Sequence, residues 1–200
     1  KLIRELERSL NQFVSFSLGF TYQAPNSGML RRFIRKKKFI NKDLSNTFFD
    51  WILPPFRNRD TWFPLYILLF IYLVFKFRMR SILIIVLAIA AIGAADGLSS
   101  HVLKPFVERL RPCNVPELAN EFILRVNHCS GGFSFPSSHA ANHFALAAFL
   151  GLVLYKKNKW FWHFGIAWAA IISFAQVYVG VHFPLDVFFG GFLGLFIGYV

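Results

Sequence analysis

Five long runs of apolar residues constrain the fold of this chain more than any other feature of its sequence. They cover residues 61–77, 81–103, 138–155, 160–181 and 185–200, each close to the roughly 20 residues that a helix needs to cross a bilayer. In lipid, only helices and closed barrels satisfy every backbone hydrogen bond, and runs of this length favour helices. The sequence therefore predicts an all-α integral membrane helical bundle, with about five transmembrane helices, or six if the N-terminal part hides another crossing.

Composition agrees with a membrane protein and excludes an ordinary soluble domain, because 56% of the residues are hydrophobic and 26 are Phe. The formal net charge of +12 raises the question of nucleic acid as a partner. However, 12 of the 22 Lys and Arg residues precede residue 60, and most of the others flank apolar runs. This distribution favours the anionic headgroups of membrane lipids over nucleic acid, and the sequence indicates no obligate protein partner.

The first 60 residues form a basic segment that we separate from a transmembrane domain at 61–200. Leu2, Ile3, Leu6 and Leu10 have amphipathic spacing, and a cluster of Arg and Lys follows at 31–38. We interpret these as an interfacial helix and a contact with lipid headgroups, although a frayed tail is an alternative. Residues 48–56 are apolar, short and broken by prolines, which favours the membrane surface over a crossing.

Two short connections are basic and orient the bundle. Lys76, Arg78 and Arg80 flank the first, and Lys residues fill the second at 156–159. By the positive-inside rule both face the cytoplasm, so the long connection 104–137 and the turn around residue 182 face outward. Five crossings would then place the basic N-terminal segment outside, against the charge bias. Either that segment lies on the outer surface or a sixth crossing is missing from this count.

The two cysteines, Cys113 and Cys129, lie in the long outward connection. In an oxidising compartment they can form a disulfide, which in the chain-entropy model would contribute about 3 kcal/mol. Two free thiols are the alternative.

Polar residues that could take part in catalysis or bind an anion gather at the outward ends of the predicted spans. His182 and Asp186 are four residues apart, and in a helix or tight turn the carboxylate can fix one imidazole tautomer. Lys104 and Arg111 are two helical turns apart, so on a continuous helix both cations point to one side and suit a phosphate. Loop histidines and snorkelling cations are the structural alternatives.

The third span begins with a possible anion site. Ser137 is placed to cap this helix, whose free N–H groups and positive dipole end attract anions. His139 lies in the first turn and can donate a proton to a leaving oxygen. His143 follows one turn later, but no third ligand has a convincing spacing for a metal site.

Three motifs in this order resemble the signature of the type 2 phosphatidic acid phosphatase superfamily, which includes lipid phosphate phosphatases, bacterial acid phosphatases and vanadium haloperoxidases. The motifs are Lys104 separated by six residues from Arg111-Pro112, then the Pro-Ser-Ser-His at 136–139, then His182 separated by three residues from Asp186. The resemblance covers 104–186, and the flanking spans extend it to about 61–200.

The resemblance implies a role for each matching residue. His182 is the nucleophile that forms a phosphohistidine, Asp186 orients it, and His139 is the general acid. The phosphoryl oxygens would be bound by Lys104, Arg111, Ser137 and the backbone around Ser138. No metal and no other cofactor is implied, because the cations and the helix end stabilise the developing charge.

Two positions depart from the signature. Ser138 stands where Gly is usual, and a serine still supplies the backbone N–H. Gln176 stands where the family usually has arginine, six residues before His182. The amide can donate a neutral hydrogen bond, but a charge-assisted contact with phosphate is lost, so we expect Gln176 to be a weak phosphate-binding residue.

The predicted function is a membrane lipid phosphatase, acting on the phosphate monoester or diphosphate of a lipid such as a polyprenyl diphosphate, phosphatidylglycerophosphate, phosphatidic acid or a lipid A phosphate. There are two alternatives. One is a lipid phosphotransferase that uses the same intermediate, and the other is a non-catalytic anion-binding or transport protein. The resemblance further suggests a bacterial inner membrane, with the active site on the periplasmic side.

Overall fold

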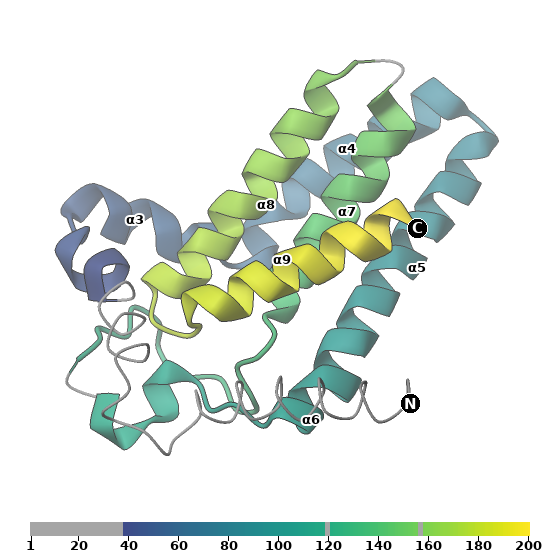
Figure 1. The fold of residues 1–200 in the computed structure, drawn as a ribbon. Helices are drawn as coiled ribbons and strands as arrows, with labels where there is room; N and C mark the ends of the chain where they lie inside the picture. Colours follow the sequence, from purple (N-terminus) through teal and green to yellow (C-terminus); the bar gives the residue numbers. More distant parts are fainter. Residues whose placement is uncertain (1–37, 119–120, 156–157) are drawn as a thin grey trace, which may run out of the picture.

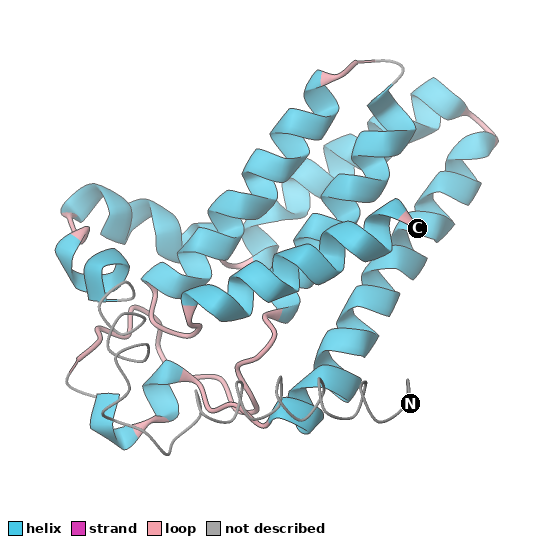
Figure 2. Cartoon of the chain, viewed as in Figure 1, coloured by secondary structure: helices cyan, strands magenta, loops and turns pink. Residues whose placement is uncertain are grey.

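A computed structural model describes residues 38–118, 121–155 and 158–200, and these form helices and connecting loops without strands (Figures 1 and 2). The predicted amphipathic helix near the N-terminus and all but the last residue of the basic cluster at 31–38 lie outside the described residues. The α-helices are α3 (Thr47–Phe56), α4 (Phe63–Phe77), α5 (Arg80–Gly97), α6 (Lys104–Val107), α7 (Ser138–Tyr155), α8 (Trp160–Tyr178) and α9 (Pro184–Tyr199).

The five predicted spans correspond to α4, α5, α7, α8 and α9, which confirms the all-α membrane bundle. Four helical stretches of the described chain are long and apolar enough to cross a membrane, and α9, with 16 residues, is slightly shorter. The second span ends in a π-helical segment, Leu98–Leu103, which leads directly into α6. Such segments are often found at functional sites, and this one lies beside the polar end of the bundle.

Helix α7 is central and packs against α5, α8 and α9. Its contact with α9 is a backbone-to-backbone approach at Gly190, Gly194 and Gly198, where an added Cβ would overlap carbonyl oxygens of α7 and of the residue just before it. The opposite face of α9 exposes Phe188, Phe192 and Phe196. Small residues that let helices approach, with aromatic side chains on the outer face, are what a lipid-facing helix requires. This packing fixes the first turn of α9 beside the first turn of α7.

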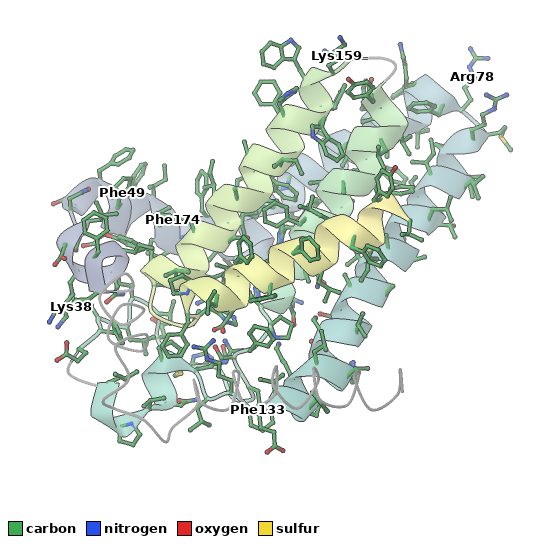
Figure 3. All side chains as sticks on the ribbon, viewed as in Figure 1. Lys38, Phe49, Arg78, Phe133, Lys159 and Phe174 are labelled. Carbon is green, nitrogen blue, oxygen red and sulfur yellow. A yellow bond between two sulfur atoms is a disulfide. The ribbon has the colours of Figure 1, made fainter. Side chains whose placement is uncertain are left out.

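The bundle has two chemically different ends. The basic turns that contain Arg78 and Lys159 lie at one end, and Phe133, in the long connection, lies at the other (Figure 3). The turn between α8 and α9 and the start of α7 also lie at the end with Phe133 (Figure 1). The two predicted basic turns therefore share one end, and the polar motifs share the other.

The described residues before position 60 pack onto the bundle. Helix α3 lies against α8, where Leu53 joins a buried cluster with Ala175, Tyr178 and Val179 (Figure 1). With ten residues, α3 is too short to cross a bilayer. Asn41 is also buried, and its amide donates to the carbonyls of Tyr178 and Ile123. The division at residue 60 stays a prediction, and no gap in packing accompanies it in the described part.

Candidate active site

His182 and Asp186 meet because a tight turn leads directly into α9. The Asp186 carboxylate accepts a hydrogen bond from the Phe183 backbone N–H at 2.8 Å, which caps the helix. The same oxygen, Oδ2, lies 3.5 Å from Nδ1 of His182. Asp186 is fully buried and His182 is 2% exposed. The carboxylate therefore holds both the start of α9 and one edge of the imidazole ring.

Two residues that the sequence did not single out complete the surroundings of Asp186. Arg109 contributes a buried ion pair, with Nη1 at 2.7 Å from Oδ1, and its guanidinium lies over the ring of Phe183. Ser134 donates a hydrogen bond to Oδ2, and its Oγ lies 3.4 Å from Nδ1 of His182. Both carboxylate oxygens are thus occupied, and a buried charge with such partners keeps one orientation.

Arg111 approaches the other edge of His182, with Nη1 at 3.2 Å from Nε2. Since guanidinium nitrogens only donate, Nε2 accepts here, and the hydrogen-bond network assigns the ring proton to Nδ1, facing Asp186. Burial lowers the pKa of His182 to about 4, Asp186 opposes this shift, and Arg111 and Lys104 add to it. The imidazole is therefore neutral near pH 7, and its Nε2 lone pair accepts from Arg111 in the absence of a phosphate.

The predicted continuous helix from Lys104 to Arg111 is wrong. Helix α6 ends at Val107, and Glu108 has a left-handed conformation with φ of 51°. Arg111 is extended, as the following Pro112 requires. In the turned and extended segment, Arg109 and Arg111 both reach the His182 turn, which a helix would not have allowed.

Lys104 converges on the site from the end of the π-helical segment. Its Nζ donates to Oγ of Ser138 at 2.7 Å. Ser99 and Ser100 also contact this hydroxyl, at 3.0 and 2.8 Å. The Ser138 side chain therefore joins α7 to the π-helical segment and the first residue of α6, a role that the backbone-only prediction missed.

The start of α7 faces this junction and the turn before α9. Ser137 caps α7, with its Oγ 3.4 Å from the Ala140 nitrogen, and its own N–H donates to the Asp186 carbonyl at 2.9 Å. His139 follows in the first turn and is half-buried. It lies close enough to His182 and Arg111 for their charges to interact. The predicted residues of all three motifs are thus brought together at one end of the bundle.

Gln176 lies in the last turn of α8 and is fully buried. Neither polar atom of its side-chain amide has a hydrogen-bond partner in the described part of the chain. Its backbone carbonyl accepts from the N–H groups of Val181 and His182, both at 3.3 Å. The residue therefore supports the nucleophile turn through its backbone, while its side chain retains unused hydrogen-bonding capacity.

Of the two alternatives for the cysteines, the structure contains the disulfide. It joins Cys113 to Cys129, with the Cα atoms 6.0 Å apart. Cys113 follows the Arg111-Pro112 pair, and the chain after Cys129 leads to Ser134. The bond therefore ties together the two loops that deliver Arg111 and Ser134 to the site.

Other polar side chains in the spans have structural partners. His143 lies 3.4 Å from the Tyr66 hydroxyl and 2.7 Å from the carbonyl of His139. Asp96 accepts a hydrogen bond from the Asn142 amide at 3.0 Å, which links α5 to α7. Within the described ranges, no three His, Cys, Asp or Glu side chains cluster in a way that could hold a metal ion.

Comparisons with known proteins agree with this arrangement. The family model described as the PAP2 superfamily matches residues 81–200. The chain is 36% identical to the lipid A 4'-phosphatase of Bacteroides thetaiotaomicron, over 78% of this chain and 70% of that protein. It is 34% identical to the undecaprenyl-diphosphatase of Sulfolobus acidocaldarius, over 74% of this chain and 65% of that protein. Across these two relatives, the chain spans about two thirds of the relative's length.

A solved structure is also similar. The crystal structure of Aquifex aeolicus LpxE superposes with a TM-score of 0.64 and 26% sequence identity. The similarity covers 82% of this chain and 91% of that one.

Proposed function

Because the chain belongs to the PAP2 superfamily, we propose that it is a membrane lipid phosphatase that works through a phosphohistidine on His182. The observation that carries this proposal is the pairing of His182, with Nδ1 facing Asp186 and Nε2 facing Arg111. A buried neutral imidazole with a fixed tautomer has its lone pair directed at the position where a phosphate would bind Arg111. Asp186 then stabilises the positive charge that forms on the ring.

The reaction proceeds in two balanced steps. Nε2 of His182 attacks phosphorus, the bond from phosphorus to the leaving oxygen breaks, and His139 gives that oxygen a proton. The dianionic substrate favours the protonated form of His139 before the attack. In the second step, His139 accepts a proton from water, the water oxygen attacks phosphorus, and the phosphorus–nitrogen bond breaks to release phosphate.

Charge on the phosphoryl oxygens is stabilised by Lys104, Arg111, Ser137 and the first N–H groups of α7. Lys104 now donates to Ser138 at 2.7 Å, and a bound phosphate would take over this donor. Cations and helix N–H groups that are already in place need little reorganisation, which is the main source of catalytic stabilisation in such sites. We expect activity without added metal or another cofactor.

A glycolipid phosphate of the lipid A type is the substrate class that we favour, because the relative with 36% identity is a lipid A 4'-phosphatase. A polyprenyl diphosphate is the second candidate, supported by the relative with 34% identity. Both lipids keep their hydrocarbon chains in the bilayer while the phosphate reaches a site at the membrane surface. By the positive-inside rule, the site faces outward, and the resemblance to the family suggests the periplasmic side of an inner membrane.

The test is phosphate release by purified protein in detergent with EDTA, using phosphorylated lipid A, undecaprenyl diphosphate, phosphatidylglycerophosphate and phosphatidic acid. We expect release from at least one of these, and His182→Ala should lower it by on the order of 10³-fold or more. His163→Ala, at an exposed position of α8, is the matched control. Absence of release from all four lipids would reject the phosphatase, and phosphate found on an acceptor other than water would identify a phosphotransferase.

A further inference from the structure

A polar pocket beside the site is not used by the mechanism above. It has a volume of about 550 Å³ and lies between the end of α3, the loop after residue 124 and the start of α7. Its wall includes Arg57 from α3, His128 from the loop, and His139 from α7. Since His139 also faces the site of phosphoryl transfer, the pocket and that site share one side chain.

The pocket is basic, and its cations are not equivalent. Arg125 forms an ion pair with Asp50 at 2.5 Å and also bonds to Ser45. Arg59 is exposed and lies 3.6 Å from Asp60. Both of these charges are therefore offset by carboxylates.

Arg57 differs from its two neighbours. It is half-buried, its Nε is buried without a hydrogen-bond partner, and no ion pair with it occurs in the part of the chain that the structure describes. Burial lowers the pKa of its guanidinium, because partial removal from water disfavours the charged form. A buried donor without a partner is costly unless a ligand satisfies it.

The position of Arg57 relative to the chemistry indicates which part of a substrate it would meet. Arg57 and His139 line the same pocket, so Arg57 lies near the site of phosphoryl transfer, and its charge acts on His139. In an in-line displacement the leaving group departs on the side opposite the nucleophile. His139, which protonates that leaving group, forms part of the pocket wall. The pocket therefore opens where the leaving group would lie.

We propose that this pocket binds a second anionic group, of the phosphate class, on the polar portion of the leaving group, with Arg57 as its main partner. The inference rests on the proposed phosphatase function and narrows its substrate. A glycolipid that carries one phosphate to be hydrolysed and another on the same sugar headgroup fits this pocket. A lipid whose leaving group is an uncharged alcohol, such as diacylglycerol, leaves Arg57 without its partner.

The experiment compares two synthetic glycolipids that share acyl chains and sugars and differ only in the second phosphate. For the wild-type protein we expect kcat/KM to be about 10-fold or more higher with the two-phosphate lipid, chiefly through KM. Arg57→Gln should lower kcat/KM for the two-phosphate lipid about 10-fold more than for the one-phosphate lipid. Arg57→Lys should recover part of this difference, and Arg80→Gln, at the exposed first residue of α5, should not change it.

The outcomes that overturn the proposal are distinct. Equal losses on both lipids, with weaker inhibition by inorganic phosphate, would place Arg57 at the transferred phosphoryl group instead. Equal kcat/KM values for the two lipids in the wild type would remove the second anion site altogether. No release from either lipid by the wild type would reject the phosphatase function for this class of lipid and the inference with it.

Discussion

The two sides of the site differ in how completely the protein satisfies them. On the nucleophile side, Asp186 is bonded through both oxygens to Arg109, Ser134 and the Phe183 N–H. Elsewhere around the site, the Gln176 amide, Nε of Arg111 and Nε of Arg57 are buried without hydrogen-bond partners in the described residues. One side is preorganised before substrate arrives, and the other has polar groups that a ligand can satisfy. The difference indicates that catalysis and substrate choice depend on separate sets of residues.

The largest effect on activity should follow from removing the charge of Asp186, the carboxylate at the centre of the nucleophile side. We expect Asp186→Asn to lower kcat by on the order of 10³-fold, because the amide cannot hold the Nδ1–H tautomer or stabilise its cation as a carboxylate does. It should also lower the free energy of unfolding by about 3–5 kcal/mol, since the buried Arg109 loses its carboxylate. Steady-state rates and thermal unfolding in detergent measure the two effects.

Asp60→Asn is the matched control, because this exposed aspartate lies beside an arginine without being buried. A variant at position 186 that unfolds more easily but keeps its kcat would show that the carboxylate is only structural.

Preorganisation also predicts an unusual pH profile. Burial lowers the pKa of His182 from its usual 6.5 to about 4. The charges of Arg111 and Lys104 lower it further, and Asp186 raises it in part. The neutral, nucleophilic form of the free enzyme therefore persists as pH falls through 6.5 and is lost only near pH 4. Over the same interval the unfolded chain binds a proton that the folded chain does not, so stability decreases as pH falls.

The measurement is kcat/KM against pH, corrected for the second ionisation of the phosphate near pH 6. An acid limb near 6.5 that remains after this correction would contradict the prediction for His182.

A smaller effect should come from the packing that brings the two sides together. An alanine at Gly194 would overlap the carbonyl of Ala141, so α9 must move away from α7. We expect Gly194→Ala to lower the free energy of unfolding by about 1–3 kcal/mol and to reduce kcat, because the first turn of α9 carries Asp186. Thermal unfolding and rates in detergent test this.

Gly93→Ala in α5 is the control, since an added Cβ there meets no atom within 4 Å. It should be neutral or slightly stabilising. Equal behaviour of the two variants would mean that the close approach of α7 and α9 does not matter.

The sequence predicts the bundle well, because the length of an apolar run and the charge of short connections are local properties. All five spans were predicted within a few residues, and the structure brings the residues of the three motifs together. The helix expected to continue to Arg111 was wrong because the left-handed turn at Glu108 is not visible in residue spacing. Pro112 did offer a signal for Arg109, because it favours extended backbone at the residue before it. In extended backbone, residues two apart point to the same side, so Arg109 and Arg111 both face the nucleophile.

Other parts of the site had no signal in the sequence. Ser134 reaches Asp186 through a loop whose path depends on the disulfide and on tertiary packing. Arg57 lies among many basic residues that suggested only lipid headgroups, and its position beside His139 arises from the packing of α3 on α8. The roles assigned to the motif residues, and the N-terminal helix outside the described ranges, stay predictions.

The smallest expected change tests the less satisfied side directly. Gln176→Arg would place a cation where the family usually has one, and we expect kcat/KM to rise by a few-fold to about 10-fold through a charge-assisted contact with phosphate. In the absence of phosphate, the new charge would stand at a fully buried position, so thermal stability should fall and should recover when inorganic phosphate is added. Gln176→Leu, which removes the amide at similar volume, should lower the rate. If the leucine variant is as active as the wild type, Gln176 does not touch the phosphoryl group. If arginine instead changes the ratio between glycolipid and polyprenyl substrates, position 176 helps to select the headgroup, and the separation of catalysis from substrate choice extends to the last turn of α8.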